Sequence, residues 1–568
     1  MTQQNWWHAL TRPAIALAAF FIATAADAGP VVRTLYGAVE GKTATTEQYL
    51  GIPYAAPPTG ALRWRPPQPP TAWNGIREAT AFGARCPQRA TPFGSYSANE
   101  DCLTLNVYTP GHQPDAKRPV MVWIHGGSFI GGAGSDYDPS DLVADGNVVV
   151  VTLNYRLGAF GFLALPSLAD ESGNIPGNYG LADQQAALRW VQQNIANFGG
   201  DPNNVTLFGE SAGGSSVSDQ LASPLAKGLF HKAIIESGFY NPAPPPVIQQ
   251  EATHALLAAS FGCGVLPTPA CLRSLSAEQI LASSAYYLTG QNGPSGLDIL
   301  GSTLTLGPVR GTSILPASPI VAFAQGRFNK VPVLNGTNHD EATGPIAMGL
   351  DPSSDPMDVN GYLRESPIDN ADFQAIVQSL FGNGALSTIV LNYVGSGAQS
   401  LASILSKVLT DSGFSCTARL ADHALAHHVP VYAYEFNDEQ SFTYLVPPSS
   451  LFPSYGATHF NEVAYIFSNV QSVFPSLNAI EPKFTPAQRA LSTYMRQAWA
   501  NFARTGNPNG RGVANWPSYG GLGADVFQSL QIPASTPEWN FATDHHCGIW
   551  DPILTLELAL PIGILGNG

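Results

Sequence analysis

Charged residues are scarce in this chain of 568 residues, at 12%, whereas hydrophobic residues make up 44%. Disordered chains show the opposite balance, so the composition predicts a large buried core. Lys and Arg number only 26 and form no run, which excludes the electrostatic surface of a nucleic-acid binder. We interpret the net charge of −15 as a contribution to solubility, the alternative being a field that attracts cationic substrates.

Long hydrophobic runs are also lacking. The stretch from Ala14 to Ala26 follows Arg12 and contains about a dozen apolar residues, too few to cross a bilayer. It leads to an A-x-A site at Ala26-Asp27-Ala28, which predicts a signal peptide over residues 1–28. A retained membrane anchor is the alternative. Residues 29–568 contain neither a linker nor a repeat, so we expect one domain, exported to the periplasm or secreted.

Cysteine is limited to six residues, and their even number in an exported chain favours disulfides. Sequence neighbours suggest three pairs, although six cysteines allow 15 connectivities; reduced thiols in a cytosolic protein are the alternative. The suggested pairs are Cys86–Cys102, Cys263–Cys271 and Cys416–Cys547. Neither an H-E-x-x-H motif nor paired C-x-x-C motifs occur, so we expect no metal.

Apolar runs alternate with helical patterns along much of the chain. Continuous β-branched and apolar runs are typical of parallel strands buried on both faces. We expect strands at 120–125, 148–155, 205–208, 231–237, 330–335 and 429–436, and helices at 178–198 and from 212 to about 221. This order predicts an α/β fold with a mainly parallel sheet, and segments 240–325 and 345–415 are expected to cover its edge.

The segment Gly209-Glu210-Ser211-Ala212-Gly213 matches G-x-S-x-G and stands between a predicted strand and a predicted helix. That context is required of a nucleophile elbow, in which the serine hydroxyl projects from a sharp turn. Ser211 is therefore the candidate nucleophile, and an ordinary glycine-rich turn is the alternative.

A second glycine motif, His125-Gly126-Gly127-Ser128-Phe129, ends an earlier strand. Acyl transfer places negative charge on the carbonyl oxygen, and fixed backbone N–H groups stabilise that charge. This motif and the N–H of Ala212 are candidates for such an oxyanion hole. An ordinary glycine turn is again the alternative.

Several longer segments resemble the type-B carboxylesterase/cholinesterase family over nearly the whole mature chain. They are Gly51-Ile52-Pro53-Tyr54-Ala55 with Arg63-Trp64, and the segments 100–108, 154–163 and 198–214. The resemblance implies the α/β-hydrolase fold, with a large and mostly parallel central sheet flanked by helices. It also implies a serine carboxylic ester hydrolase that needs no cofactor.

The same resemblance implies further site residues. The family's acid corresponds to Glu341 in segment 336–342, and its histidine corresponds to His459 in segment 456–462. The oxyanion N–H groups correspond to those of Gly127, Ser128 and Ala212. The family often has glycine at position 128. The serine side chain here therefore narrows the part of the site that would hold the acyl group of the substrate. Its disulfide pattern fits all three suggested cysteine pairs.

Rival residues exist for each role. His339 is the main rival of His459, and we discount it because neighbours on one strand point to opposite faces. Asp340 is the rival acid. Glu210 is expected either to stabilise the imidazolium or to be a simple turn carboxylate, and His545 and His546 are expected to be structural.

The expected reaction is hydrolysis of a small-molecule ester through an acyl-enzyme on Ser211, with His459 as base and Glu341 orienting it. A lipase, thioesterase, peptidase or amidase with the same triad is one alternative. A non-catalytic binding protein on this fold is another. We expect neither nucleic acid nor stable membrane insertion, and the sequence does not determine the oligomeric state.

Overall fold

The computed structural model describes residues 1–2 and 29–557, apart from a set of internal segments and single positions. These are 92, 170, 172, 284–305, 349–366, 383, 395–399, 444–448, 453, 468, 471–483, 514 and 521–524. The predicted signal peptide therefore lies almost entirely outside the described residues. Within them, no helix combines the length and the apolar character that crossing a membrane requires.

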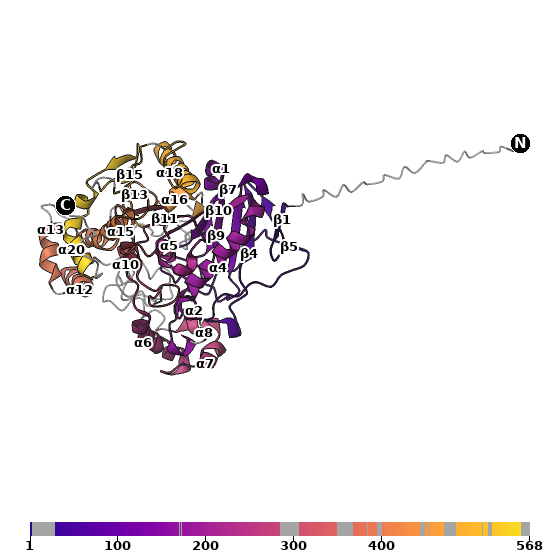
Figure 1. Ribbon diagram of the computed structural model, residues 1–568, viewed down its shortest axis with the longest axis horizontal. Helices are drawn as coiled ribbons and strands as arrows, with labels where there is room; N and C mark the ends of the chain where they lie inside the picture. Colours follow the sequence, from indigo (N-terminus) through magenta and orange to yellow (C-terminus); the bar gives the residue numbers. More distant parts are fainter. Residues whose placement is uncertain are drawn as a thin grey trace.

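A large mixed sheet forms the centre of the described chain (Figure 1). Its eleven strands follow the order β16-β15-β13-β12-β11-β10-β7-β9-β6-β4-β3. The strands from β9 to β15 pair in parallel, whereas β6, β4 and β3 at one edge and β16 at the other pair in antiparallel fashion. This is the mostly parallel sheet that the sequence predicts.

The strands have the following bounds: β1 Val31–Thr34, β2 Gly37–Glu40, β3 Lys42–Thr43, β4 Glu47–Pro53, β5 Ile76–Glu78, β6 Thr104–Thr109, β7 Arg118–Ile124, β8 Tyr137–Asp138, β9 Val149–Leu153, β10 Gly200–Glu210, β11 Lys232–Glu236, β12 Val333–Asn338, β13 Val431–Phe436, β14 Asn469–Val470, β15 Phe527–Leu530 and β16 Thr536–Glu538.

The helices have the following bounds: α1 Ser140–Gly146, α2 Gly158–Phe162, α3 Pro166–Ala169, α4 Tyr179–Asn194, α5 Ala212–Ala222, α6 Val247–Ala258, α7 Pro269–Ser274, α8 Ala277–Ala282, α10 Pro319–Ala324, α11 Thr343–Ala347, α12 Asn370–Phe381, α13 Ala385–Tyr393, α14 Leu401–Leu409, α15 Cys416–Ala426, α16 Val463–Ile466, α18 Pro486–Thr505, α19 Phe541–Asp544 and α20 Cys547–Glu557.

Burial explains why the central strands read as continuous apolar runs. All residues of β9, β11, β12 and β13 are buried, because helices cover both faces of a parallel sheet. Helices α5, α10 and α15 contact one another, while α1, α16 and α18 form a second group (Figure 1). The loops after the parallel strands emerge at the same edge of the sheet, which is where α/β proteins place their sites.

The longest of these helices shows how local sequence sets element ends. Helix α18 begins with a capping box between Thr485 and Gln488 and has Pro486 in its first turn. It ends at Gly506, whose φ of 77° is the left-handed conformation that glycine adopts without strain. Its side chain Trp499 donates a hydrogen bond of 2.7 Å to Glu236 at the end of β11, so the helix is tied to the edge of the sheet that carries the site.

Three disulfides cross-link the described chain: Cys86–Cys102, Cys263–Cys271 and Cys416–Cys547. They are the pairs suggested by sequence order. The first fixes the segment before β6, and the third joins the start of α15 to the start of α20. The C-terminal helix is thereby attached to the helical layer beside β12 and β13.

Candidate active site

Ser211 occupies a sharp turn between β10 and α5. Its φ of 55° and ψ of −124° are costly for any residue that carries a Cβ. Flanking glycines permit the turn: a Cβ at Gly213 would lie 2.0 Å from the carbonyl oxygen of Ile124, and a Cβ at Gly209 would lie 2.6 Å from it. The Ser211 N–H donates to the carbonyl oxygen of Glu236 at 3.0 Å. This strand–turn–helix geometry is that of a nucleophile elbow.

His459 and Glu341 form a buried pair from two different loops. His459 Nδ1 lies 2.6 Å from Glu341 Oε2, and the two side chains are 8% and 0% exposed. Glu341 follows β12, and its other oxygen accepts from the Asn338 N–H at 2.8 Å. The His459 N–H donates to the Glu341 carbonyl oxygen at 3.2 Å. These contacts orient the imidazole with Nε2 directed away from the carboxylate.

The nucleophile and the imidazole share one aromatic environment. The Ser211 hydroxyl is hydrogen-bonded to Tyr240, which follows β11. His459 Nε2 lies 3.2 Å from Glu210 Oε1, a contact without hydrogen-bond geometry because that oxygen has no hydrogen-bond partner. The Phe414 ring lies 5.2 Å from the His459 ring and 5.6 Å from the Tyr240 ring, between centroids. The serine side chain is therefore engaged with Tyr240.

The glycine loop after β7 packs directly on the elbow. A Cβ at Gly126 would lie 3.0 Å from Ser211 Cβ, so only glycine allows this approach. Gly127 and Ser128 have φ of 99° and 53°. Within the described part of the chain, no oxygen accepts from the N–H groups of Gly127, Ser128 and Ala212. Three backbone donors thus remain available next to the serine hydroxyl.

Two side chains brace this loop. The buried amide of Gln88 accepts from the Gly132 N–H and donates to the Gly132 carbonyl oxygen, each at 2.9 Å. The His125 ring stacks on Tyr155 at 4.5 Å, and the Tyr155 hydroxyl donates to the His125 carbonyl oxygen at 3.0 Å. Burial lowers the pKa of His125 to about 4, so this ring is neutral and structural.

Carboxyl groups gather behind the elbow. Glu210, Glu236, Glu341 and Glu462 are each no more than 1% exposed. Burial raises the pKa of Glu210 well above its usual range, and the other three carboxyls raise it further. Burial also raises the pKa of Glu462 to about 7, with a further contribution from Glu341. Burial and these neighbours therefore favour the neutral form of Glu210, which weakens it as an electrostatic partner of an imidazolium.

The rival residues are directed elsewhere. Asp340 Oδ2 accepts from the Ala457 N–H at 3.0 Å, and its Oδ1 lies 3.4 Å from His339 Nδ1. The expectation that His339 and Glu341 lie on one strand is wrong, because β12 ends at Asn338. The turn that follows directs His339 toward Asp340 and directs Glu341 toward His459.

Sequence reasoning missed three side chains of this environment: Tyr240, Phe414 and Gln88. A signal existed for Tyr240, because it follows a parallel strand next to β10 and must emerge at the same edge. Phe414 lies in a π-helical turn, Thr410–Ser415, with no motif to mark it. Gln88 belongs to the first disulfide loop, and its contact with Gly132 depends on folding alone.

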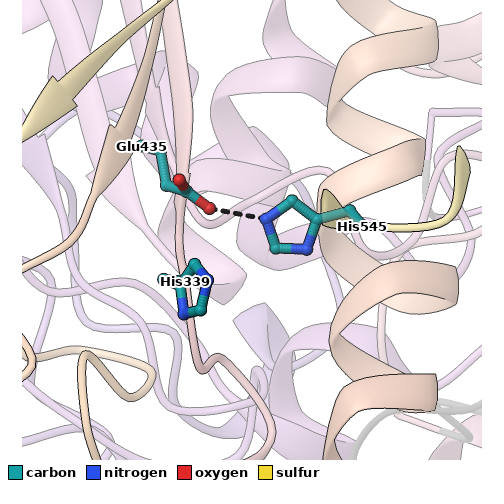
Figure 2. Close-up of side chains that lie close together, drawn as sticks. All are labelled: His339, Glu435 and His545. Atoms are coloured by element: carbon teal, nitrogen blue, oxygen red, sulfur yellow. Dashed lines mark hydrogen bonds and ion pairs between the residues drawn. The ribbon is translucent and has the colours of Figure 1, made fainter. Parts of the chain in front are cut away.

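A separate group of side chains has the composition of a metal site. Among the described residues, His339, Glu435 and His545 have ligand atoms within 4.8 Å of one another. Burial opposes a charged His545, but Glu435 and Asp411 outweigh it and raise the pKa of His545 to about 10. Figure 2 shows the three side chains, which include none of the candidate catalytic residues.

Known proteins place this chain in a family. The model of the carboxylesterase family matches residues 28–550. Cocaine esterase of Homo sapiens is 37% identical over 509 residues, covering 85% of this chain and 83% of the relative. Para-nitrobenzyl esterase of Bacillus subtilis (strain 168) is 37% identical over 501 residues, covering 86% of this chain and 92% of the relative.

A solved structure of PNB esterase superposes with a TM-score of 0.71 at 36% identity, covering 91% of this chain and 98% of that protein. The chain belongs to the carboxylesterase family and is a carboxylic ester hydrolase of the α/β-hydrolase fold.

Proposed function

We propose that this protein hydrolyses carboxylic esters through a Ser211–His459–Glu341 triad and an acyl-enzyme intermediate. The observation that carries the proposal is the buried 2.6 Å contact between His459 and Glu341, close to the strained turn that presents Ser211. A carboxylate on Nδ1 fixes the tautomer in which Nε2 is free to accept a proton. Three residues from distant loops then supply nucleophile, base and orienting acid.

In the first half of the reaction, Ser211 Oγ attacks the ester carbonyl carbon while His459 Nε2 takes the hydroxyl proton. Ser211 must first leave Tyr240 and turn toward the imidazole, a rearrangement that substrate binding commonly brings about. The protonated imidazole then gives its proton to the leaving alcohol. Water attacks the acyl-enzyme with His459 again as base, and Ser211 is regenerated.

The negative charge that develops on the carbonyl oxygen requires fixed donors. The unpaired N–H groups of Gly127, Ser128 and Ala212 support an oxyanion hole at this position. Each such donor is typically worth about 10²–10³ in rate. Because the donors belong to the backbone, serine at position 128 leaves them intact while its side chain occupies space on the acyl side.

We infer that the substrates are small-molecule esters with a compact acyl group. Ser128, Tyr240 and Phe414 stand around the nucleophile, and the two aromatic rings limit the room beside Ser211. Related proteins are named for a cocaine ester and a para-nitrobenzyl ester, so aromatic alcohol or acyl groups are suitable first tests. A panel of p-nitrophenyl esters of rising acyl length measures the limit directly.

We further propose export to the periplasm or beyond the cell. The proposal is supported by three disulfides in the described chain, because such bonds persist mainly in oxidising compartments. The signal-like segment over residues 1–28 points the same way. Amino-terminal sequencing of the secreted or periplasmic fraction tests it, and a mature chain that retains residues 1–28 contradicts it.

The decisive test of the triad is Ser211→Ala. We expect kcat/KM for p-nitrophenyl acetate to fall by at least about 10³-fold, because no other hydroxyl stands in the elbow, and labelling by a fluorophosphonate probe to disappear. Ser218→Ala is the matched control: this buried serine of α5 donates only to the Gly214 carbonyl oxygen. Undiminished hydrolysis by a folded Ser211→Ala protein rejects the proposal.

A further inference from the structure

The side chains of His339, Glu435 and His545 converge from three elements that are distant in sequence. Glu435 lies on β13 opposite Thr337 of β12, and the N–H of His339, directly after β12, donates to the carbonyl oxygen of Phe436 at 3.0 Å. His545 comes from the junction between α19 and α20. Figure 2 shows the His339 ring facing the hydrogen-bonded pair of Glu435 and His545.

The distances suit a small ion with two nitrogen ligands and one oxygen ligand. All three ligand atoms lie within 4.8 Å of one another, and His545 Nε2 lies 2.5 Å from Glu435 Oε1. Ligands on a tetrahedral zinc ion with bonds of about 2.0–2.1 Å are about 3.4 Å apart. Side-chain movements of about 1 Å, opening the Glu435–His545 contact and closing toward His339, therefore suffice.

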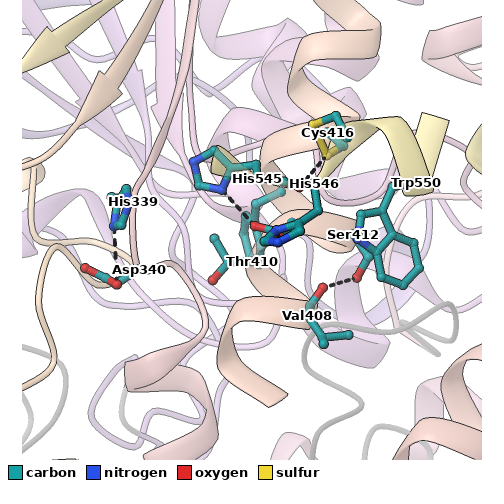
Figure 3. Close-up of polar contacts among 12 residues, drawn as sticks. His339, Asp340, Val408, Thr410, Ser412, Cys416, His545, His546 and Trp550 are labelled. Carbon is teal, nitrogen blue, oxygen red and sulfur yellow. Dashed lines mark hydrogen bonds and ion pairs between the residues drawn. A yellow bond between two sulfur atoms is a disulfide. The ribbon is translucent and has the colours of Figure 1, made fainter. Parts of the chain in front are cut away.

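A carboxylate other than Glu435 also contacts each imidazole, and Figure 3 shows the contact of Asp340 with His339. Asp411 Oδ1 lies 2.8 Å from His545 Nδ1, and Asp340 Oδ1 lies 3.4 Å from His339 Nδ1. A carboxylate on one ring nitrogen orients the other nitrogen toward a metal and makes it a better ligand. Asp411 is itself fixed by the Tyr393 hydroxyl, which donates to Oδ2 at 2.7 Å.

A fourth oxygen is available at the same place. Glu538 at the end of β16 interacts with Glu435, and its Oε1 is buried with no hydrogen-bond partner. The cluster thus contains two imidazoles and two carboxyls, with Asp411 and Asp340 as further neighbours of the imidazoles.

We propose that His339, Glu435 and His545 bind one zinc ion, with Glu538 or a water molecule as the fourth ligand. Two imidazoles exclude Ca²⁺ and Mg²⁺, which prefer oxygen ligands alone, and a mixed nitrogen and oxygen set of three or four ligands is typical of Zn²⁺. The site is structural, because Glu435 and His545 are buried and the Ser211 environment contributes none of its ligands.

Such an ion would connect the chain segment that carries the triad acid to the C-terminal region. His339 is two residues before Glu341, whereas His545 is two residues before Cys547, which is disulfide-bonded to Cys416. Zinc and the disulfide would then hold the turn after β12 from one side, while Asn338 and His459 hold it from the other.

The test begins with the full chain after treatment with a chelator. This protein is titrated with ZnCl₂ at pH 8 in an isothermal calorimeter, and its metal content is measured after desalting. We expect one zinc per chain. His339→Ala removes a partly exposed ligand, and Glu435→Gln keeps a hydrogen-bonding group of the same shape; each is expected to weaken zinc binding by more than about 100-fold. Circular dichroism verifies that both variants are folded.

The matched control is the double variant His427→Ala/His428→Ala, which removes a neighbouring pair of rings 6.5 Å apart near the surface. It is expected to bind zinc as the unchanged protein does. The proposal is overturned if the unchanged chain retains no zinc. It is also overturned if folded His339→Ala and Glu435→Gln proteins bind zinc with unchanged affinity, since the ion then sits elsewhere.

Discussion

Among single residues, the two glutamates that approach His459 differ in charge and in orientation. Glu341 contacts Nδ1 at 2.6 Å and is fixed by a backbone N–H. Glu210 lies 3.2 Å from Nε2, and burial together with its acidic neighbours raises its pKa well above the usual range. Position, rather than residue type, assigns the orienting role to Glu341.

We therefore expect Glu341→Gln and Glu210→Gln to behave differently. An amide at 341 no longer fixes the productive tautomer of His459, so kcat/KM should fall by about 10²–10⁴-fold. An amide at 210 resembles the neutral acid that burial favours, so the loss should stay below about tenfold. Steady-state kinetics with p-nitrophenyl acetate at pH 7.5 measures both. Equal losses in the two variants would mean that an ionised Glu210 is essential.

Tyr240 illustrates why the resting geometry differs from that of a working triad. Its hydroxyl holds the Ser211 side chain, and a neutral hydrogen bond of this kind is worth about 1 kcal/mol. A substrate that fills the space beside Ser211 offsets that amount easily.

At the scale of elements, the oxyanion loop depends on a segment that carries no chemistry. Gln88 lies within the Cys86–Cys102 loop and bonds both backbone groups of Gly132. The same amide donates to the Cys86 carbonyl oxygen at 3.1 Å. The disulfide, Gln88 and the glycine loop thus form one packed unit, in which the donors at Gly127 and Ser128 are held at the elbow.

Gln88→Ala should lower kcat without a comparable change in KM. Loss of the amide leaves two buried backbone groups of Gly132 unpaired, at a cost of about 1–3 kcal/mol, and lets the donor loop shift. A displacement of about 1 Å can cost about 10²-fold in rate, so we expect kcat to fall by about 10–100-fold. Exposed Gln68→Ala is the control. A lowered melting temperature with unchanged kcat would show that the brace serves stability alone.

The strands that sequence analysis locates are those buried on both faces. The run 148–155 contains β9, and 429–436 contains β13, because continuous apolar sequence is what such strands require. The strands of a separate three-stranded sheet, in the order β1-β2-β5, were not located for the same reason. In β1 buried and exposed residues alternate, and all three residues of β5 are exposed, so neither produces a long apolar run.

The residues of the site likewise differ in whether a local sequence pattern reveals them. Ser211 and the glycine loop lie in short local motifs. In each motif the neighbouring residues determine the backbone geometry. Asp340 and Glu341 are adjacent in sequence, and only the turn after β12 separates their directions. The His339–Glu435–His545 cluster has no motif spacing at all, since its members are 96 and 110 residues apart. Strand register and packing bring them together, and neither can be read from one sequence.

At the scale of the whole molecule, the acidic balance of −15 overstates the charge of the folded protein. Burial raises the pKa of several carboxyls well above their usual range, so the folded chain binds protons at these groups more tightly than the unfolded chain does. They are Glu210, Asp219, Glu236 and Asp422. The folded state consequently loses stability as the pH rises through the range in which unfolded carboxyls ionise.

The variant Glu462→Gln isolates the contribution of one buried carboxyl to the pH dependence of folding stability. Burial, with Glu341 adding to it, raises the pKa of Glu462 from 4.5 to about 7, so the folded state binds more protons than the unfolded state between these values. Stability should fall across that window by about 3 kcal/mol and stay low above it. The variant lacks this titration, so we expect it to melt about 2–3 °C above the unchanged protein at pH 8 and at the same temperature near pH 4.5. Exposed Glu439→Gln is the control, and an offset that is equal at both pH values would assign the effect to packing instead of protonation.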